Sequence, residues 1–326
     1  MSSINYLEII QKAWAITWKN KYLWWFGFFV ALGGTGGINF FFNSGDEKKL
    51  DPAQNEKFLE FFSQNMSWII TLIIIAFSLL IIFSILNILG RGALIASIEK
   101  NFQGQTADFK SGWNSGKKNF WKIFYINIFL SLFIFFTLII LIAPLAVLFL
   151  NKNYIIGGIL SFLAVFIFIP LVILVSYLRI YSYLYAVLGK LNFWPSLENA
   201  YNLFAKNIWP SIILSLIFIP LSFVFMLVIF TILLILFFIF LLLGGIAFWL
   251  FGKITAIIIG AIGIIIFLLI LLFLQSIYAV FSQSIWILFF HEIATPKVEE
   301  VLAEIKEEEK ETVAKPMPVI ETRKEN

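Results

Sequence analysis

Residues 207–252 read NIWPSIILSLIFIPLSFVFMLVIFTILLILFFIFLLLGGIAFWLFG and contain no Asp, Glu, Lys or Arg. An α-helix rises about 1.5 Å per residue, so about 20 apolar residues cross a hydrocarbon core of about 30 Å. A helix also satisfies its own backbone hydrogen bonds, which lipid does not do. This stretch therefore predicts a membrane-spanning helix, and it gives the criterion for finding others.

The rest of the 326-residue chain has the same character. Hydrophobic residues make up 61% of it and charged residues 13%, against about 25% charged residues in a typical globular protein. This composition excludes a soluble enzyme. The chain has no Cys and one His, so thiolate metal sites, thiol nucleophiles and most histidine chemistry are excluded as well. The net charge of +4 sums opposed regions, and we expect no nucleic-acid partner.

Six charge-free runs predict six transmembrane helices in an all-α polytopic protein. The runs are residues 22–45, 61–90, 123–151, 153–178, 207–252 and 254–291. The fifth run is long enough for two crossings, but Pro220 and the pair Gly244 and Gly245 more simply predict a kink and a turn. The first run contains four Gly within residues 33–37, so a broken or re-entrant segment is an alternative there.

The positions of Lys and Arg predict the orientation. Twelve of them flank the spans on the side of the N-terminus and five flank the other side, with six more in the C-terminal tail. Positively charged short loops stay in the cytoplasm. We therefore expect a protein of the cytoplasmic membrane with both termini in the cytoplasm. A cleaved signal peptide is the rival interpretation of residues 1–34, but its apolar part is crowded with Trp and Phe, and no cleavage site follows.

One pattern occurs three times along the chain: an aromatic residue, four residues, Lys-Asn, one residue, then a second aromatic residue. The copies are Trp14, Lys19, Asn20 and Tyr22; Trp113, Lys118, Asn119 and Trp121; and Tyr201, Lys206, Asn207 and Trp209. A small residue precedes each first aromatic residue: Ala13, Gly112 and Ala200. Arg91 and Arg179 each lie 22 residues before the first aromatic residue of the following copy, and Gln275 is a weak counterpart in the last hairpin.

Each copy also has helical amphipathicity. In the third copy, Leu197, Tyr201, Phe204 and Ile208 share one face, which is typical of a helix lying at the membrane surface with its apolar side in acyl chains. The pattern predicts three units of interfacial helix plus transmembrane hairpin, at residues 4–98, 106–189 and 195–291. The candidate lipid-headgroup contacts are the two arginines and the Lys and aromatic positions of the pattern: Arg91, Arg179, Lys19, Lys118, Lys206, Trp113, Trp121, Tyr201 and Trp209.

A family resemblance rests on small and aromatic positions in the second unit. They are Gly92-Ala93-Leu94-Ile95, Gly104-Gln105-Thr106, Phe109, Trp113, Gly116 and Phe120-Trp121. Over most of residues 4–291 the chain resembles uncharacterised bacterial multi-spanning membrane proteins, some of them grouped with the membrane domain found beside glycerophosphodiester phosphodiesterases. In those proteins the chemistry belongs to a separate soluble domain. The resemblance therefore implies a membrane fold and no catalytic residues.

The spans also bear on function, because coupled transport normally needs ionisable groups inside the bilayer. The runs contain no Asp, Glu, Lys or Arg, although Asn87, Asn127, Gln275 and Gln283 could line a polar path. Helix packing is the simpler interpretation of these neutral side chains. For Arg91 and Arg179, snorkelling to headgroups is the simpler interpretation, and bidentate binding of a lipid phosphate is the sharper one. We expect a non-enzymatic structural or lipid-interacting protein without cofactors. The alternative is a transporter or channel for a neutral or lipidic solute.

The charged tail at residues 292–326 forms the second predicted region. Its middle, from Val298 to Val313, is expected to be helical through spaced Glu and Lys, and its end to be disordered. His291 and Glu292 lie next to each other, but one His and one Glu do not make a metal site. A protein partner on the tail is a minor alternative to simple solvation. The sequence leaves the oligomeric state open.

Overall fold

The computed structural model describes residues 4–33 and 63–314, and all the regular structure in these ranges is helical. Two short helices come first and a third follows α7, while the other five are much longer. The bounds are α1 Tyr6–Lys19, α2 Leu23–Leu32, α5 Met66–Phe102, α6 Phe109–Leu150, α7 Tyr154–Val187, α8 Phe193–Lys206, α9 Ile208–Phe251 and α10 Lys253–Ala314.

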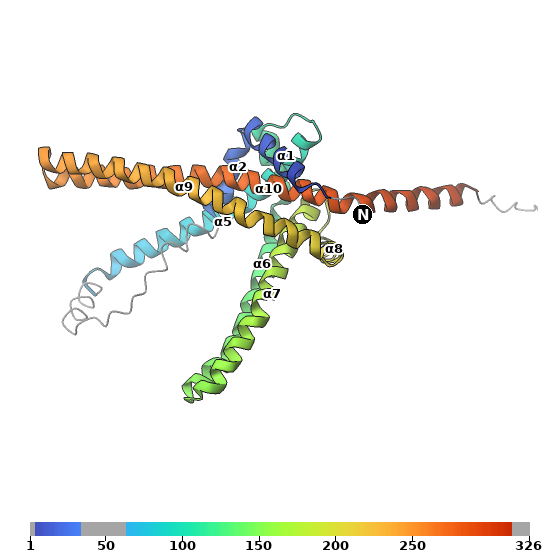
Figure 1. Cartoon of the computed structure of the whole chain (residues 1–326), viewed down its shortest axis with the longest axis horizontal. Helices are drawn as coiled ribbons and strands as arrows, with labels where there is room; N and C mark the ends of the chain where they lie inside the picture. Colours follow the sequence, from blue (N-terminus) through green and yellow to red (C-terminus); the bar gives the residue numbers. More distant parts are fainter. Residues whose placement is uncertain (1–3, 34–62, 315–326) are drawn as a thin grey trace, which may run out of the picture.

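The long helices radiate from a common centre, which we call the hub, as apolar arms (Figure 1). The hub comprises residues 4–33, 87–130, 175–214 and 276–294, and the arms comprise residues 66–86, 131–174 and 215–275. Nearly all buried side chains lie in the hub, including Phe26, Tyr181, Phe281 and Phe289. In the arms, the buried residues are all small: Gly157, Ala247 and Gly263. The chain therefore forms a protein core only at one end of its long helices.

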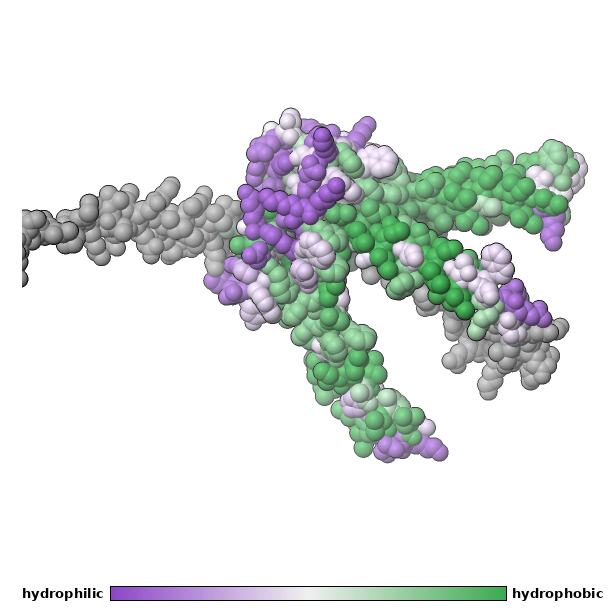
Figure 2. Space-filling model, turned by 180° about the vertical axis from the view of Figure 1, so that it is seen from behind, coloured by the Kyte–Doolittle hydropathy of each residue, from purple (hydrophilic) through white to green (hydrophobic). Residues whose placement is uncertain are grey.

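The arms present apolar side chains on all sides. Figure 2 shows a hydrophobic surface along each arm, with hydrophilic residues over the hub and at the arm tips. The five long helices are each long and apolar enough to cross a membrane. Lipid tails are as apolar as these side chains, so separated arms lose no hydrophobic stabilisation in a bilayer. The protein is a multi-pass helical membrane protein.

The prediction of six spans is confirmed only in its coarser form, because five helices meet the criterion. The first run begins with α2, which is ten residues long, and continues into residues 34–62, outside the described part of the chain. The fifth run is one continuous helix, α9, with Pro220 inside it. The predicted turn at Gly244 and Gly245 was wrong. The chain reverses at Gly252, whose φ of 85° and ψ of −175° suit only glycine.

The polarity of the two ends follows the predicted division of charge. The twelve Lys and Arg residues that were assigned to one side all lie in the hub ranges, and Lys152 and Lys253 lie at the tips of the α6–α7 and α9–α10 hairpins. The other three, Lys48, Lys49 and Lys57, lie outside the described residues. The predicted tail begins as a continuation of α10, which extends to Ala314. Its end, residues 315–326, is also outside the described part.

The predicted interfacial helices differ between the units. Residues 6–19 and 193–206 form the separate helices α1 and α8, whereas the second copy is the first part of α6 and continues into the arm without a break. Pro210 has no N–H to bond to the preceding turn, which explains why a new helix starts after Asn207. The predicted exposure of the third copy's apolar face to acyl chains was wrong for Leu197 and Phe204. Both are buried, on the helix that packs against α7.

The hub helices pack in a cyclic order. α1 packs on α10, the first part of α6 packs on α5, and α8 packs on α7. Representative contacts are the ring of Trp14 edge-on to Phe281 at 5.6 Å between centroids, and Tyr177 stacked on Phe204 at 4.7 Å. Each copy of the pattern thus lies against the last helix of the predicted unit before it, and the first copy lies against α10, the last helix of the third predicted unit.

Close packing in the hub depends on small residues where α5 and α6 cross. Gly112 and Gly116 lie four residues apart on α6, so they share one face. A Cβ atom on Gly116 would meet the backbone oxygen of Leu89 and the side chain of Ala93. The two backbones therefore approach each other closely, which fixes the hub ends of α5 and α6 relative to each other.

Candidate lipid-headgroup site

Three helices each contribute two polar side chains, one helical turn apart, to a single cluster at the junction of hub and arms. The members are Asn87 and Arg91 on α5, Asn127 and Ser131 on α6, and Arg179 and Tyr183 on α7. Residues at positions i and i+4 lie on the same face of a helix. The spacing therefore places each pair on one face, and the packing of the three helices brings the faces together. We call this group the arginine cluster.

Hydrogen bonds and one ring contact connect the members of the cluster. Between α6 and α7, Arg179 donates from Nη2 to the Ser131 hydroxyl at 3.3 Å, and the Tyr183 hydroxyl donates to Oδ1 of Asn127 at 3.2 Å. The guanidinium carbon of Arg91 lies 5.8 Å from the centre of the Tyr183 ring, within the range of a cation–π contact. The Tyr183 ring of α7 thus stabilises the positive charge of Arg91 on α5.

Arg91 is also held from its own helix. Its Nε donates to Oδ1 of Asn87 at 3.1 Å, and the amide nitrogen of Asn87 donates to the backbone oxygen of Val30 at 2.6 Å. Asn87 is 7% exposed and Tyr183 is 4% exposed. The two residues that position Arg91 are therefore fixed parts of the hub, which limits how far the guanidinium can move.

The two arginines have neutral hydrogen-bond partners. Neither makes an ion pair with a carboxylate within the described ranges, where Lys12 pairs with Glu8 and His291 lies at hydrogen-bond distance from Glu99. Nε of Arg179 is buried and has no hydrogen-bond partner. Ser131 is exposed, so the cluster opens to the surroundings along the Ser131–Arg179 edge. Two positive charges and an unused buried N–H group form an arrangement that an anion would complete.

The place of the arginines along their helices also differs from the prediction. They end the charge-free runs as expected, but α5 continues from Arg91 to Phe102 and α7 continues from Arg179 to Val187. Most of these following residues are buried in the hub. Both arginines therefore lie where the exposed apolar arms meet the buried hub, and the helix ends lie beyond them.

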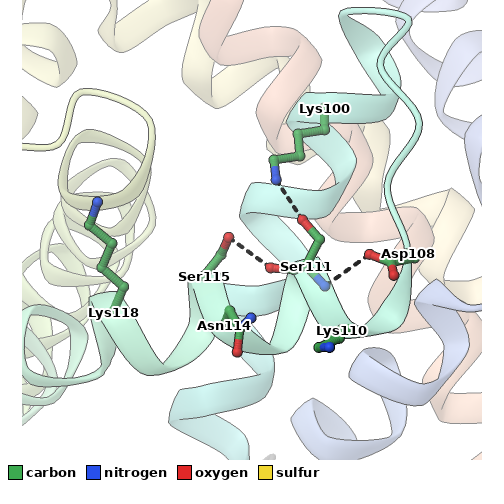
Figure 3. Close-up of a pocket in the computed structure, with 7 residues that line it drawn as sticks. All are labelled: Lys100, Asp108, Lys110, Ser111, Asn114, Ser115 and Lys118. Carbon is green, nitrogen blue, oxygen red and sulfur yellow. Dashed lines mark hydrogen bonds between the residues drawn. The ribbon is translucent and has the colours of Figure 1, made fainter.

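A second group of basic residues lines an open pocket of about 450 Å³ at the start of α6 (Figure 3). Lys100 donates to the Ser111 hydroxyl at 2.6 Å, and the carboxylate of Asp108 accepts from the Ser111 backbone N–H at 2.9 Å. Lys110 and Lys118 also line this pocket. Asp108 offsets part of the positive charge, and the lysines stand on an open surface. The pocket is therefore a weaker anion site than the arginine cluster.

The structure does not bring the predicted Lys-Asn pairs to the arginine cluster. Each asparagine instead makes the same local bond, donating to the backbone oxygen four residues earlier: Asn20 to Ile16, Asn119 to Ser115 and Asn207 to Leu203. Lys19, Lys118 and Lys206 precede these asparagines and are exposed. The Lys positions therefore lie on the hub surface, and the asparagines belong to the helices' own hydrogen bonding.

The aromatic positions differ among themselves. Trp121, Tyr201 and Trp209 are 60%, 55% and 74% exposed. Trp113 is half-buried, with Phe29 of α2 at 5.6 Å and the Lys117 ammonium at 5.9 Å from its ring. The exposed three suit a membrane interface, where amphipathic rings are enriched.

Sequence reasoning missed Tyr183 and Ser131, and for Asn87 and Asn127 it favoured helix packing over a polar path without linking them to the arginines. The signal was available in the spacing. Asn87 lies four residues before Arg91 and Tyr183 lies four residues after Arg179, which places each on the face of its arginine. Ser131 could not be assigned in this way, because its contact depends on how α6 packs on α7.

The single histidine also has a partner that the sequence did not indicate. Nε2 of His291 lies 2.6 Å from Oε2 of Glu99, which joins α10 to α5. The residue next to it in sequence, Glu292, instead lies near Lys12 of α1, whose pKa is raised by its hydrogen bond to Glu8 and, to a smaller extent, by Glu292. Among the described residues, no three His, Asp or Glu side chains are grouped as a metal site requires.

Comparisons with known protein families, curated proteins and solved structures found no match for this chain. The class of the protein is therefore defined by its own architecture, a multi-pass helical membrane protein with a polar cluster at the junction of hub and arms.

Proposed function

We propose that this is a non-enzymatic, lipid-interacting protein of the cytoplasmic membrane that holds an anionic lipid headgroup between α5, α6 and α7. The hub faces the cytoplasm, the apolar arms cross the bilayer, and the headgroup binds Arg91 and Arg179. Guanidinium groups bind phosphate through paired N–H groups, which an ammonium group cannot do. The family resemblance is compatible with this role, since it implies a membrane domain without chemistry of its own.

The observation that carries the proposal is the pair of half-buried arginines without a carboxylate partner in the described part of the chain. Arg91 is held by Asn87 and by the Tyr183 ring, and Arg179 has an unused buried Nε–H. Plain snorkelling needs a free side chain that extends to the headgroups and gives no reason for these contacts. Fixed positions and unused donors favour a specific anion.

The hub's positive charge supports the proposed orientation. All twelve Lys and Arg residues that the sequence groups on one side lie in the hub ranges. The repeated unit also stays a proposal, and two observations favour it: the three identical asparagine bonds and the cyclic packing order. In this arrangement the arginine cluster lies at the junction of the first and second units.

The transporter alternative is less well supported, because several polar side chains of the spans, both predicted asparagines among them, are used in helix contacts. Asn87 bonds to Val30 and Arg91, and Asn127 accepts from Tyr183. Ser222 bonds to the Tyr278 hydroxyl at 2.6 Å. These pairs favour packing over a path for a solute. We expect no uptake driven by a pH or sodium gradient in proteoliposomes, and gradient-driven uptake abolished by Asn87→Ala would favour the transporter.

Native mass spectrometry of the gently extracted protein tests the proposal. The double variant Arg91→Lys/Arg179→Lys keeps both charges but loses the paired N–H geometry. We expect the wild type to retain anionic phospholipid and the double variant to retain several-fold less. The chain's third arginine, Arg323, lies outside the described residues and gives a matched control, Arg323→Lys, with wild-type retention expected. Equal lipid retention in all three proteins would refute the headgroup site.

A further inference from the structure

We infer that the headgroup preferred by the arginine cluster is a phosphomonoester, the terminal phosphate of a lipid with no further group attached. This inference rests on the proposed function and narrows it to one chemical class. The charge of the cluster, its free donors and its surroundings support this preference.

The charge of the arginine cluster favours a phosphomonoester. Arg91 and Arg179 carry two positive charges, and the four other members of the cluster, Asn87, Asn127, Ser131 and Tyr183, are uncharged in the physiological range. A phosphodiester headgroup carries one negative charge, so it leaves one guanidinium without a counter-charge in a half-buried position. A phosphomonoester carries about −1.5 to −2 charge at pH 7, because its second pKa is about 6. Only the monoester approaches the charge of the two arginines.

The number of hydrogen-bond donors in the cluster also favours a phosphomonoester. A guanidinium has five N–H groups. Arg91 uses one on Asn87 and Arg179 uses one on Ser131, which leaves four on each. One of those on Arg179, Nε–H, is buried and has no partner. A phosphomonoester offers three terminal oxygens and a phosphodiester offers two. The surplus of donors therefore favours the phosphomonoester, which has more acceptor oxygens and more negative charge on each oxygen.

The apolar surroundings of the cluster favour a lipid as the source of the phosphate. The exposed edge of the cluster, Ser131 and Arg179, continues directly into the bare apolar surfaces of the α6 and α7 arms. Phe135, one helical turn beyond Ser131 toward the tip of the arm and on the same face of α6, is 54% exposed. A headgroup bound here places its acyl chains along these arms, where apolar contact with chains is favourable, while a soluble phosphate gains nothing from them. The geometry thus points to a lipid.

Lipid titration followed by native mass spectrometry tests the inference. The probes are phosphatidic acid, which is a phosphomonoester, and phosphatidylglycerol, a phosphodiester with the same acyl chains. We expect phosphatidic acid to bind about tenfold more tightly at pH 7.5, since a charge-assisted hydrogen bond is worth about one factor of ten or more. At pH 5.5 the monoester is mostly singly charged, so the preference should fall several-fold. Arg91→Lys/Arg179→Lys should weaken both lipids and remove most of the preference.

The outcomes separate the two proposals. Equal affinities for the two lipids, both reduced in the double variant, would overturn the monoester inference and leave the headgroup site standing. Affinities unchanged in the double variant would overturn the headgroup site itself. Glycerol 3-phosphate at millimolar concentration supplies the free-phosphate arm. Displacement of phosphatidic acid by it would overturn the lipid as the source, and the absence of displacement supports the lipid.

Discussion

In the proposed headgroup site, neutral polar side chains hold the two arginines in place. Asn87, Asn127 and Tyr183 position the arginines without adding charge of their own. A carboxylate in any of these places would form an ion pair with an arginine and compete with an external anion. The residue types of the cluster are therefore those that hold two guanidinium groups and leave their charge available.

Tyr183 contributes a ring to Arg91 and a hydroxyl to Asn127, and substitutions can separate the two. Tyr183→Phe keeps the ring, so we expect retained phosphatidic acid to fall by less than twofold. Tyr183→Leu keeps an apolar side chain but removes the cation–π contact, worth about 0.5 to 2 kcal/mol, so retention should fall about threefold or more. Native mass spectrometry measures both. Tyr125→Leu, on the exposed face of α6, is the control, and equal losses in the Phe and Leu variants would contradict a role for the ring.

At the scale of elements, the helices are longer than a bilayer requires. α9 has 44 residues and α6 has 42, against about 20 for a crossing of about 30 Å. The residues beyond those needed for one crossing lie in two places. On α5, α6, α7 and α10 they form part of the hub, and on α9 most of them lie in the arm. A longer apolar stretch is accommodated in a membrane by tilting, which agrees with arms that diverge from a common hub (Figure 1).

The hairpin between α9 and α10 depends on the single residue that joins them. Gly252 has φ 85° and ψ −175°, and a side chain there costs about 1 to 3 kcal/mol. We expect Gly252→Ala to lower the midpoint of thermal unfolding in detergent. Gly244→Ala, at a helical position of α9 with open space around it, should leave the midpoint unchanged or raise it slightly. An unchanged midpoint for Gly252→Ala would show that the turn adapts without cost.

The elements were largely predictable, because a charge-free run is a strong local signal. Their ends were less so: Arg91 and Arg179 end the apolar runs, but helix continues where protein replaces lipid around it. The fate of an amphipathic face was not predictable either. The apolar stripe of Leu197 and Phe204 suits acyl chains and a protein surface equally well, and only the packing of α8 on α7 decides between them.

For the whole molecule, the cyclic order of packing explains how the long helices share one hub. Each copy of the sequence pattern packs on the last helix of the preceding predicted unit, so α1 closes the ring on α10. The small residue before each first aromatic residue is buried: Ala13, Gly112 and Ala200. The sequence shows that a small residue recurs at this position. That the position is a helix contact follows only from how the helices pack in the hub.

Overpacking at two of these contacts tests the cyclic arrangement. Ala13 and Ala200 are fully buried, so Ala13→Leu and Ala200→Leu should each destabilise the hub by about 1 to 3 kcal/mol. Ala15 and Ala205 lie on the exposed faces of the same helices, and leucine there should be tolerated. Thermal unfolding in detergent compares the four variants. If Ala13→Leu alone were neutral, α1 would not close the ring.

The orientation of hub and arm tips in the membrane can be measured directly, because the chain has no Cys and any introduced Cys is a unique probe. Asn202 is exposed on α8 in the hub, and Asn151 is exposed in the turn between α6 and α7. The concentration of Lys and Arg in the hub favours the proposed cytoplasmic location of the hub. In intact cells, a membrane-impermeant maleimide should therefore label Asn151→Cys and leave Asn202→Cys unlabelled until the membrane is opened. Labelling of Asn202→Cys alone from outside would show that the orientation is the reverse of the one proposed. Equal labelling of both positions in intact cells would mean that the α7 arm does not cross the bilayer, because α7 connects the two.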